Sequence, residues 1–321
     1  MTTVGATAAI DRFGKAASRV PDLIFRTLSG AFGWVIVAIL GLLGVLLFLN
    51  SNEAITKFGL SFLMGTTWDP IAGIYGALPF IVGTIASSAI AIIIATPIGL
   101  LTAIFLAELA PRRVAIPLTF TIELLAAIPS VVFGLWGVFV LAPFLKKTLE
   151  AWISGAIGWI PIFAGPTDGV GLFAAGVILT LMILPTSIAI SRDFITAVPD
   201  SQREAMLALG ATRWEMITKS VLPYARSGII GAVILGLGRA LGETMAVTMV
   251  IGNKTQIPNS IFQSSQTIAS QIATTFNEAS LGLQTSALIG LGLVLLAITM
   301  TLNVVARLLV WRVSGRGEGR R

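Results

Sequence analysis

The chain has 321 residues and a net charge of +6; 55% of its residues are hydrophobic and only 11% are charged. This composition is typical of a polytopic membrane protein and excludes an ordinary soluble domain. The absence of cysteine and histidine excludes disulfides and thiolate metal sites, and it removes the usual general base and the commonest metal ligand. We therefore expect no catalytic residues and no metal site in this chain.

Six apolar segments are long enough to cross a bilayer. The first is longer than the core of a signal peptide and is followed by no cleavage pattern, so we expect it to be retained. The third is too long for one perpendicular crossing and must tilt, kink near Pro129 or include a re-entrant stretch. The six predicted spans, which make the fold all-α, are Ala31–Leu49, Leu78–Leu106, Val114–Leu145, Val170–Ile190, Gly228–Gly252 and Ala287–Val310.

The basic residues predict the orientation of these spans. Sixteen of the 21 Lys and Arg residues fall on the side of the N-terminus, and only four fall on the other side. Such a bias marks the cytosolic side, so six spans with both termini in the cytosol are the consistent arrangement. The same distribution explains the positive charge without nucleic acid as a partner. The remaining basic residue, Arg239, lies inside the fifth span.

The loop between the fourth and fifth spans is a polar stretch, SQREAMLALGATRWEMITKSVLP, which reads as two short helices. Ser201 with Glu204 and Thr212 with Glu215 have the spacing of capping boxes, and Gly210 lies where a left-handed helix end is expected. In the second helix, an apolar stripe is predicted from the spacing of Trp214, Ile217 and Val221. A solvated loop with two well-capped turns would also fit this pattern.

The same loop resembles the EAA loop of permease subunits from ATP-binding-cassette importers. Met206 replaces the second alanine of that motif and Ser220 its isoleucine. The resemblance implies that the first short helix docks on a cytosolic ATPase and transmits its movement, with the glycine allowing a bend. By this resemblance the candidate coupling residues are Arg203, Glu204, Ala205, Leu207, Gly210, Leu222 and Pro223.

Two charges lie within the apolar fifth span. An arginine or a carboxylate near the bilayer centre costs about 2.5 to 3.5 kcal/mol on insertion scales, so neither is expected to face lipid. Arg239 and Glu243 are four residues apart and would share one face of a continuous helix. They could merely neutralise each other, or Arg239 could bind a crossing oxyanion while Glu243 orients it. Thr244 could offer a hydroxyl to the substrate or bond its own helix.

This segment narrows the resemblance. The stretch GRALGETMAVTMVIGN, with AIPSVVFGLWG from Ala127 and LPTSIAISRDFITAVP from Leu184, is similar to the C-type permease of high-affinity phosphate (Pst) importers over roughly residues 61–311. The resemblance implies a type I import fold in the plasma membrane and three kinds of protein partner: a second, PstA-type permease, two PstB-type ATPases and an extracytoplasmic phosphate-binding protein. Lipid surrounds the complex.

No glycine-rich nucleotide motif occurs in the chain, so ATP and magnesium would be bound by the ATPase and this chain would hold no cofactor. The chain is then a transport subunit and not an enzyme. Another oxyanion, such as sulfate or molybdate, is an alternative substrate. An ion-coupled anion transporter or channel is an alternative class, which would need no docking helix.

The predicted organisation follows from these assignments. Within the external connection formed by residues 252–283 we expect an amphipathic helix at the outer surface. Glu123, in the third span, is expected either to bond a neighbouring helix or to lie near the pathway. The predicted segments are a cytosolic N-terminal segment 1–30, a first helix 31–49, an external loop 50–77, a transmembrane domain 78–311 with a coupling loop 191–225, and a basic tail 312–321.

Overall fold

The computed structural model describes residues 19–280 and 282–314, so most of the predicted N-terminal segment and most of the basic tail lie outside the described residues. The chain divides after Asn50 into two compact units, which are described separately. The described residues of the first unit form one helix, α2 (Arg19–Asn50). It includes the predicted span Ala31–Leu49 and begins earlier because Leu23, Phe25 and other apolar residues continue the hydrophobic run.

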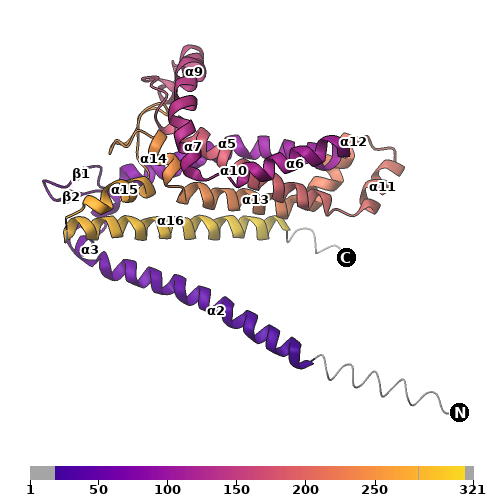
Figure 1. The fold of residues 1–321 in the computed structure, drawn as a ribbon, viewed down its shortest axis with the longest axis horizontal. Helices are drawn as coiled ribbons and strands as arrows, with labels where there is room; N and C mark the ends of the chain where they lie inside the picture. Colours follow the sequence, from indigo (N-terminus) through magenta and orange to yellow (C-terminus); the bar gives the residue numbers. More distant parts are fainter. Residues whose placement is uncertain (1–18, 281, 315–321) are drawn as a thin grey trace. The chain divides into compact units, whose positions relative to one another are not determined.

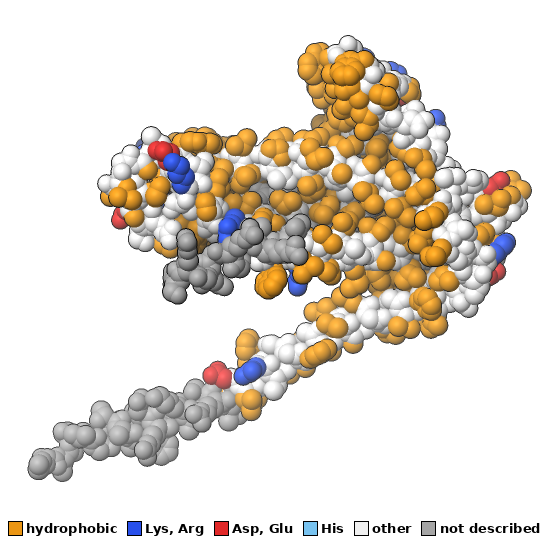
Figure 2. Space-filling view, turned by 180° about the vertical axis from the view of Figure 1, so that it is seen from behind, with side chains coloured by type: hydrophobic (Ala, Val, Ile, Leu, Met, Phe, Trp, Pro, Cys, Tyr) orange, Lys and Arg blue, Asp and Glu red, His pale blue; other side chains and the backbone are white. Residues whose placement is uncertain are grey.

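Six helical stretches in the described residues are long and apolar enough to cross a membrane, as predicted. They are Pro21–Asn50, Leu78–Leu109, Ser130–Ile157, Leu172–Thr196, Arg213–Gly242 and Leu283–Leu308. Figure 2 shows hydrophobic side chains covering the flank of the second unit and charged side chains gathering mainly at its two ends.

The second unit is almost entirely helical. Its longer helices are α5 (Leu78–Ile104), α6 (Arg112–Ala126), α10 (Leu172–Thr196), α13 (Leu222–Gly242) and α16 (Leu283–Ser314). The shorter helices are α3 (Asn52–Phe58), α4 (Ser61–Met64), α7 (Ser130–Trp136), α8 (Ala142–Lys147), α9 (Leu149–Ile157), α11 (Asp200–Ala208), α12 (Arg213–Met216), α14 (Met245–Val250) and α15 (Ile268–Thr275).

Three π-helical turns, two 3-10 turns and one small hairpin complete the described residues of the second unit. The π turns are η1 (Phe105–Leu109), η2 (Gly137–Leu141) and η4 (Ile217–Val221), and the 3-10 turns are η3 (Pro161–Phe163) and η5 (Phe276–Glu278). The hairpin pairs β1 (Trp68–Asp69) with β2 (Ile74–Tyr75) in antiparallel register, Trp68 opposite Tyr75. The rings of Trp68 and Tyr75 meet edge to face, with their centroids 4.8 Å apart.

The central helix of the second unit is α10, which packs against α5 and α13 (Figure 1). Small residues make this contact close: Ala91, Ala174 and Ala175 are fully buried, and a side chain at Gly176 would overlap Ile90. Small residues allow helix backbones to approach in a membrane, where lipid offers no hydrophobic drive for association. The prolines inside α5 and α10 are accommodated within this packing.

The third predicted span is broken. α6 ends at Ala126 and α7 begins at Ser130, with Pro129 in an extended conformation between them. This confirms a kink near Pro129, where proline removes a backbone donor and disfavours helix before it. The predicted end at Leu145 is wrong, because the helical stretch continues to Ile157.

The segment that follows α14 is also different from the prediction. Only Ile268–Thr275 forms a helix of eight residues, and its first four residues are buried. The Ile268 N–H donates to Thr84 Oγ1 of α5 at 2.9 Å. The connection thus contains the predicted helix, but the first half of this helix is buried against α5 and only its second half reaches the surface.

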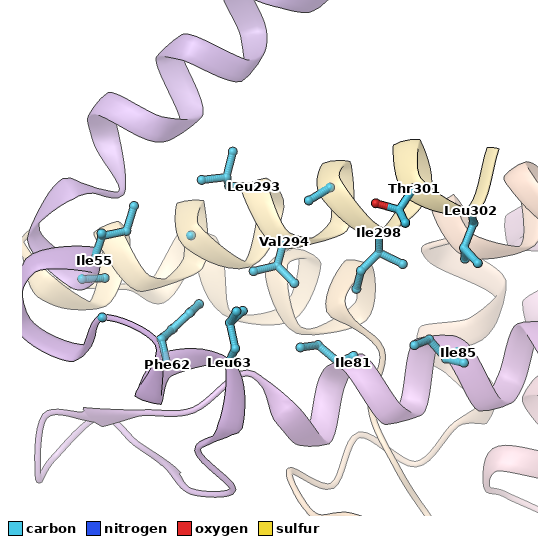
Figure 3. Close-up of a pocket in the computed structure, with 14 residues that line it drawn as sticks. Ile55, Phe62, Leu63, Ile81, Ile85, Leu293, Val294, Ile298, Thr301 and Leu302 are labelled. Carbon is cyan, nitrogen blue, oxygen red and sulfur yellow. The ribbon is translucent and has the colours of Figure 1, made fainter. Parts of the chain in front are cut away.

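An apolar cavity of about 620 Å³ lies between α3, α4, α5 and α16. Figure 3 shows Leu63, Ile81, Val294 and Ile298 around it. Its lining contains no charged residue, so this cavity offers nothing that would bind an anion.

Candidate functional site

The polar loop predicted as two short helices forms an elbow, defined here as residues 200–221. α11 ends at Ala208, and Gly210 takes a φ of +81° that favours glycine. The Gly210 N–H donates to Leu207 O and the Ala211 N–H to Met206 O, which is the Schellman pattern of a helix end. The expected role of Gly210 in ending the first helix is confirmed.

One of the two predicted capping boxes is present. The Thr212 side chain accepts a bond from the Glu215 N–H at 3.3 Å, while the Thr212 N–H donates to Glu215 Oε2 at 3.1 Å. The box at Ser201 is wrong, because α11 begins at Asp200 after Pro199 and has no side-chain cap. Proline before the first turn supplies a fixed φ and lacks a donor, so the helix starts earlier than the box predicts.

α11 has two different faces. Arg203 and Met206, three residues apart, are half-buried, and Met206 packs toward a cluster that includes Ile195, Val198 and Ile217. Glu204, Ala205 and Leu207 are exposed. The structure thus places three candidate coupling residues on an open surface and turns Arg203 inward.

The second half of the elbow anchors it to the bundle. Ile217 and Val221 are buried as predicted, whereas Trp214 is 66% exposed and does not join their stripe. The buried side of this segment runs through Met216, Ile217 and Val221 and leaves Trp214 outside it. Two further coupling candidates follow directly: Leu222 packs against the same cluster, and Pro223 lies in the first turn of α13.

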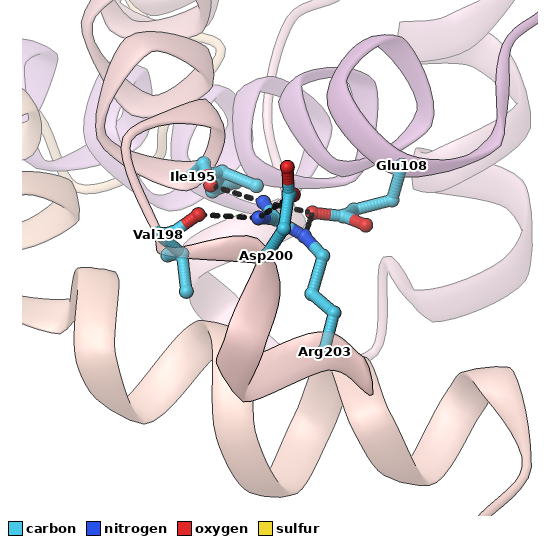
Figure 4. Close-up of polar contacts among 5 residues, drawn as sticks. All are labelled: Glu108, Ile195, Val198, Asp200 and Arg203. Carbon is cyan, nitrogen blue, oxygen red and sulfur yellow. Dashed lines mark hydrogen bonds and ion pairs between the residues drawn. The ribbon is translucent and has the colours of Figure 1, made fainter. Parts of the chain in front are cut away.

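The Arg203 guanidinium lies between three segments (Figure 4). Its Nε and Nη2 donate to Glu108 Oε1 at 3.1 and 2.8 Å, and Nη2 also donates to Ile195 O at 2.9 Å. Its Nη1 donates to Asp200 Oδ1 at 3.1 Å and to the carbonyl oxygen of Val198. The side chains of Arg203 and Glu108 are only 16% and 7% exposed.

The two charges of the fifth span are not on one helical face. α13 ends at Gly242, Glu243 is extended, and α14 begins at Met245. Glu243 Oε1 accepts from the Ala246 N–H at 3.3 Å at the start of α14. No ion pair joins Arg239 and Glu243 among the residues that the structure describes. The expectation of a continuous helix with a paired Arg and Glu is therefore wrong.

Arg239 itself is loosely held. It is exposed on α13, and its Nη1 lies 3.5 Å from Thr186 Oγ1 of α10. Thr244, expected near the pathway, donates its hydroxyl to Gly242 O at 3.2 Å, in the break between α13 and α14. A helix rises about 1.5 Å per residue, so Arg239 lies about 25 Å along α13 from Leu222, the residue that follows the elbow.

The face of α13 that carries Arg239 is not covered within the second unit. A side chain added at Gly231, Gly238 or Gly242 would meet nothing within 4 Å. Glu123 of α6 is also exposed, and no hydrogen bond from another helix reaches it among the described residues, so the expected bond is wrong. Arg239 lies within a candidate span, where a charge does not favour lipid, so its exposed position indicates a face that another molecule or water covers.

Two acidic residues were missed by the sequence analysis. Glu108 is the partner of Arg203, and only its place at the polar end of an apolar span could have drawn attention to it. Glu150 of α9 is 1% exposed; its Oε2 accepts from the Gly169 N–H at 2.9 Å, and its Oε1 has no hydrogen-bond partner. The described residues contain no group of three or more acidic side chains that could hold a metal ion.

Comparison with known proteins matches residues 95–316 to the family described as "Binding-protein-dependent transport system inner membrane component". The chain is 44% identical over 299 residues to the phosphate transport system permease protein PstC of Mesorhizobium japonicum, covering 92% of this chain and 91% of that protein. It is 43% identical over 297 residues to PstC of Haemophilus influenzae, covering 91% and 94%.

Solved structures share the fold at low sequence identity. A bacterial ABC transporter involved in the import of the acidic polysaccharide alginate is 16% identical with a TM-score of 0.55, covering 87% of this chain and 96% of that chain. The inward-facing MetNI methionine ABC transporter is 17% identical with a TM-score of 0.51, covering 76% and 95%. These similarities support the type I importer permease fold that the resemblance implied.

Three observations point to the same family. They are the long apolar helices, the elbow with its EAA-like residues, and the extent of both sequence matches. The chain belongs to the binding-protein-dependent transport system inner membrane components and, within them, to the PstC-type permeases.

Proposed function

We propose that this chain is the membrane-spanning permease subunit of an ATP-driven phosphate importer, and that it forms half of the translocation pathway. The observation that carries the proposal is its 44% identity, across 92% of the chain, to a phosphate permease of nearly the same extent. A permease needs a membrane domain and a means of receiving energy, and the six spans and the elbow supply candidates for both.

The orientation that fits this function puts the elbow and both termini in the cytosol. The excess of basic residues on that side supports it. The exposed Glu204, Ala205 and Leu207 of α11 then form the surface for an ATPase, which binds ATP and magnesium. A PstB-type pair of ATPases would serve this chain and its permease partner.

The uncovered face of α13 is the surface that we assign to a second, PstA-type permease. The open row of Gly231, Gly238 and Gly242 allows another helix to approach closely. Arg239, on the same helix, would then face the boundary between the two permeases, where water and an oxyanion can reach it. A guanidinium suits phosphate because its fork can bond two oxygens at once. A phosphate-binding protein would deliver the substrate at the opposite end of the bundle.

The test is phosphate uptake by the complete complex in proteoliposomes, with ATP on the elbow side of the membrane and the binding protein on the other. We expect uptake that requires ATP, the binding protein and the ATPase, and that excess sulfate or molybdate does not suppress. Suppression by sulfate or molybdate would make the substrate another oxyanion. Uptake by the permeases alone, driven by an ion gradient, would make the protein a secondary transporter and contradict the proposal.

A further inference from the structure

The Arg203 guanidinium has no free donor. A guanidinium carries five N–H groups, and the structure gives Arg203 hydrogen bonds to Glu108 Oε1 from two nitrogens, to Asp200 Oδ1, and to two backbone carbonyls. Binding an ATPase residue through this side chain would break at least one of these bonds. Arg203 is therefore not available as a contact to the ATPase, although it lies on the coupling helix.

The bonds of Arg203 join three separate regions of the fold. Glu108 lies in η1, directly after the spanning helix α5. Ile195 and Val198 lie at the end of α10, where the last carbonyl groups of a helix lack a full set of intrahelical partners and favour a cation. Arg203 itself belongs to α11. One side chain thus connects the coupling helix to the ends of the second and fourth spans.

The other attachments of α11 are few. Among its residues only Arg203 and Met206 are half-buried, and the rest are exposed. A further polar contact, between Ser220 Oγ and Gln202 Oε1 at 3.4 Å, reaches η4 within the elbow and not a spanning helix. The backbone from Ala197 to Pro199 already joins α11 to α10, but no such short connection joins it to α5. A force applied to the exposed face of α11 therefore reaches the end of the second span through the Arg203–Glu108 pair and the Met206 contact.

We infer that Arg203 and Glu108 transmit the displacement of α11 to the second and fourth spans, and that Arg203 is a positioning residue and not an ATPase contact. The inference rests on the proposed function, because it assigns a step in energy coupling. The shielding of the pair from water makes its loss costlier than the loss of an exposed ion pair. Glu204, Ala205 and Leu207 keep the contact to the ATPase.

The experiment measures phosphate uptake and ATP hydrolysis in the same proteoliposomes containing the complete complex. Glu108→Gln keeps the shape of the side chain and removes its charge. Arg203→Lys keeps the positive charge but replaces a side chain with five N–H donors by one with three. Because the outer face of α11 is intact, we expect the ATPase to co-purify in unchanged amount and to hydrolyse ATP. Phosphate moved per ATP should fall by about tenfold or more in Glu108→Gln and by less in Arg203→Lys, since only the latter keeps an ion pair to Glu108.

Lys219→Gln is the matched control. It removes an ion pair of the same elbow, to Glu215 at 2.9 Å, whose side chains are 63% and 39% exposed. We expect phosphate moved per ATP to stay unchanged, because exposed pairs contribute little.

The inference is wrong if uptake and hydrolysis fall in proportion, or if the ATPase no longer co-purifies, because either result would assign the pair to folding or docking. It is also wrong if both variants keep the unmutated ratio. A failure of the proposed function gives a different result, which is an unmutated complex that takes up no phosphate.

Discussion

At the scale of single residues, the two charges of the fifth span have separate surroundings. Glu243 accepts a hydrogen bond from the Ala246 N–H and helps to start α14. Arg239 remains exposed, with Thr186 Oγ1 at 3.5 Å as a weak neighbour. Arg239 is thus neither neutralised by Glu243 nor tightly packed, which is the condition in which a guanidinium can exchange its partners for those of an oxyanion.

Arg239→Gln is expected to lower phosphate uptake without lowering the amount of assembled complex. Hydrogen bonds to a charged group contribute about 1.5 to 3 kcal/mol, so the loss should be about tenfold to a hundredfold. Uptake is measured per amount of complex recovered by affinity purification, with Lys254→Gln, outside the spans, as the control. An equal loss of uptake and of assembled complex would assign Arg239 to structure instead.

At the scale of elements, α5 has a close contact with the buried segment before α15. A side chain at Gly83 would overlap the carbonyl oxygen of Gln266, and the neighbouring Thr84 Oγ1 accepts from the Ile268 N–H. Backbone lies against backbone here, so little can move aside. Gly99, further along the same helix, has its nearest neighbours at 3.6 Å, which is ordinary contact distance for an added methyl group.

Gly83→Ala is therefore expected to lower stability, and Gly99→Ala is not. The first overpacks the contact and should destabilise the chain by about 1 to 3 kcal/mol. The second should be neutral or stabilise it by up to about 1 kcal/mol, because alanine is favoured over glycine within a helix. Thermal unfolding of the purified chain in detergent gives the comparison. Equal melting temperatures would contradict the close approach at Gly83.

At the scale of the whole molecule, the second unit leaves one side of α13 open. Arg239 and Glu123 are exposed at positions within or beside spanning helices, and three glycines of α13 have open space in front of them. Arg239 lies within a candidate span, and holding a guanidinium against lipid there would be costly. Assembly with a second permease over the α13 face would remove that cost and leave a polar boundary for the substrate.

Gly231→Leu should show whether the open face of α13 contacts a second permease or lipid. A Cβ added at Gly231 meets nothing within 4 Å among the residues that the structure describes, so insertion and yield of the chain expressed alone should be unchanged. In the complex the leucine would hold the neighbouring helix away, and co-purification of the second permease should fall severalfold because small residues are needed for close helix contact. Unchanged co-purification would mean that this face of α13 meets lipid.

Much of the fold was predictable because the length of an apolar run of residues can be read directly from the sequence. Runs such as Leu78–Leu106 must be helical where no water can satisfy the backbone. The end of α11 was equally local, since Gly210 alone supplies the left-handed turn. The resemblance of the coupling loop followed from the spacing of Glu204, Gly210 and Pro223.

The errors came where contacts distant in sequence decide the outcome. The fifth span reads as continuous in the sequence, yet α13 ends at Gly242 and α14 packs against α7 of another span. Trp214 fits the helical spacing of Ile217 and Val221, but the cluster that buries those two residues, formed by distant parts of the chain, does not reach Trp214. The environments of Glu150 and Glu108 depend on Gly169 and Arg203, which lie far along the chain.

The amino-acid sequence by itself determined the six apolar spans, the residues of the elbow that form the coupling motif, and the family to which the chain belongs. These properties depend on hydrophobic length and on residues spaced within a few turns. The tertiary structure alone decided that Arg203 points inward to Glu108, that Arg239 and Glu243 are separate, and which face of α13 stays open. Those facts arise from the packing of distant helices, whose orientation no local spacing specifies.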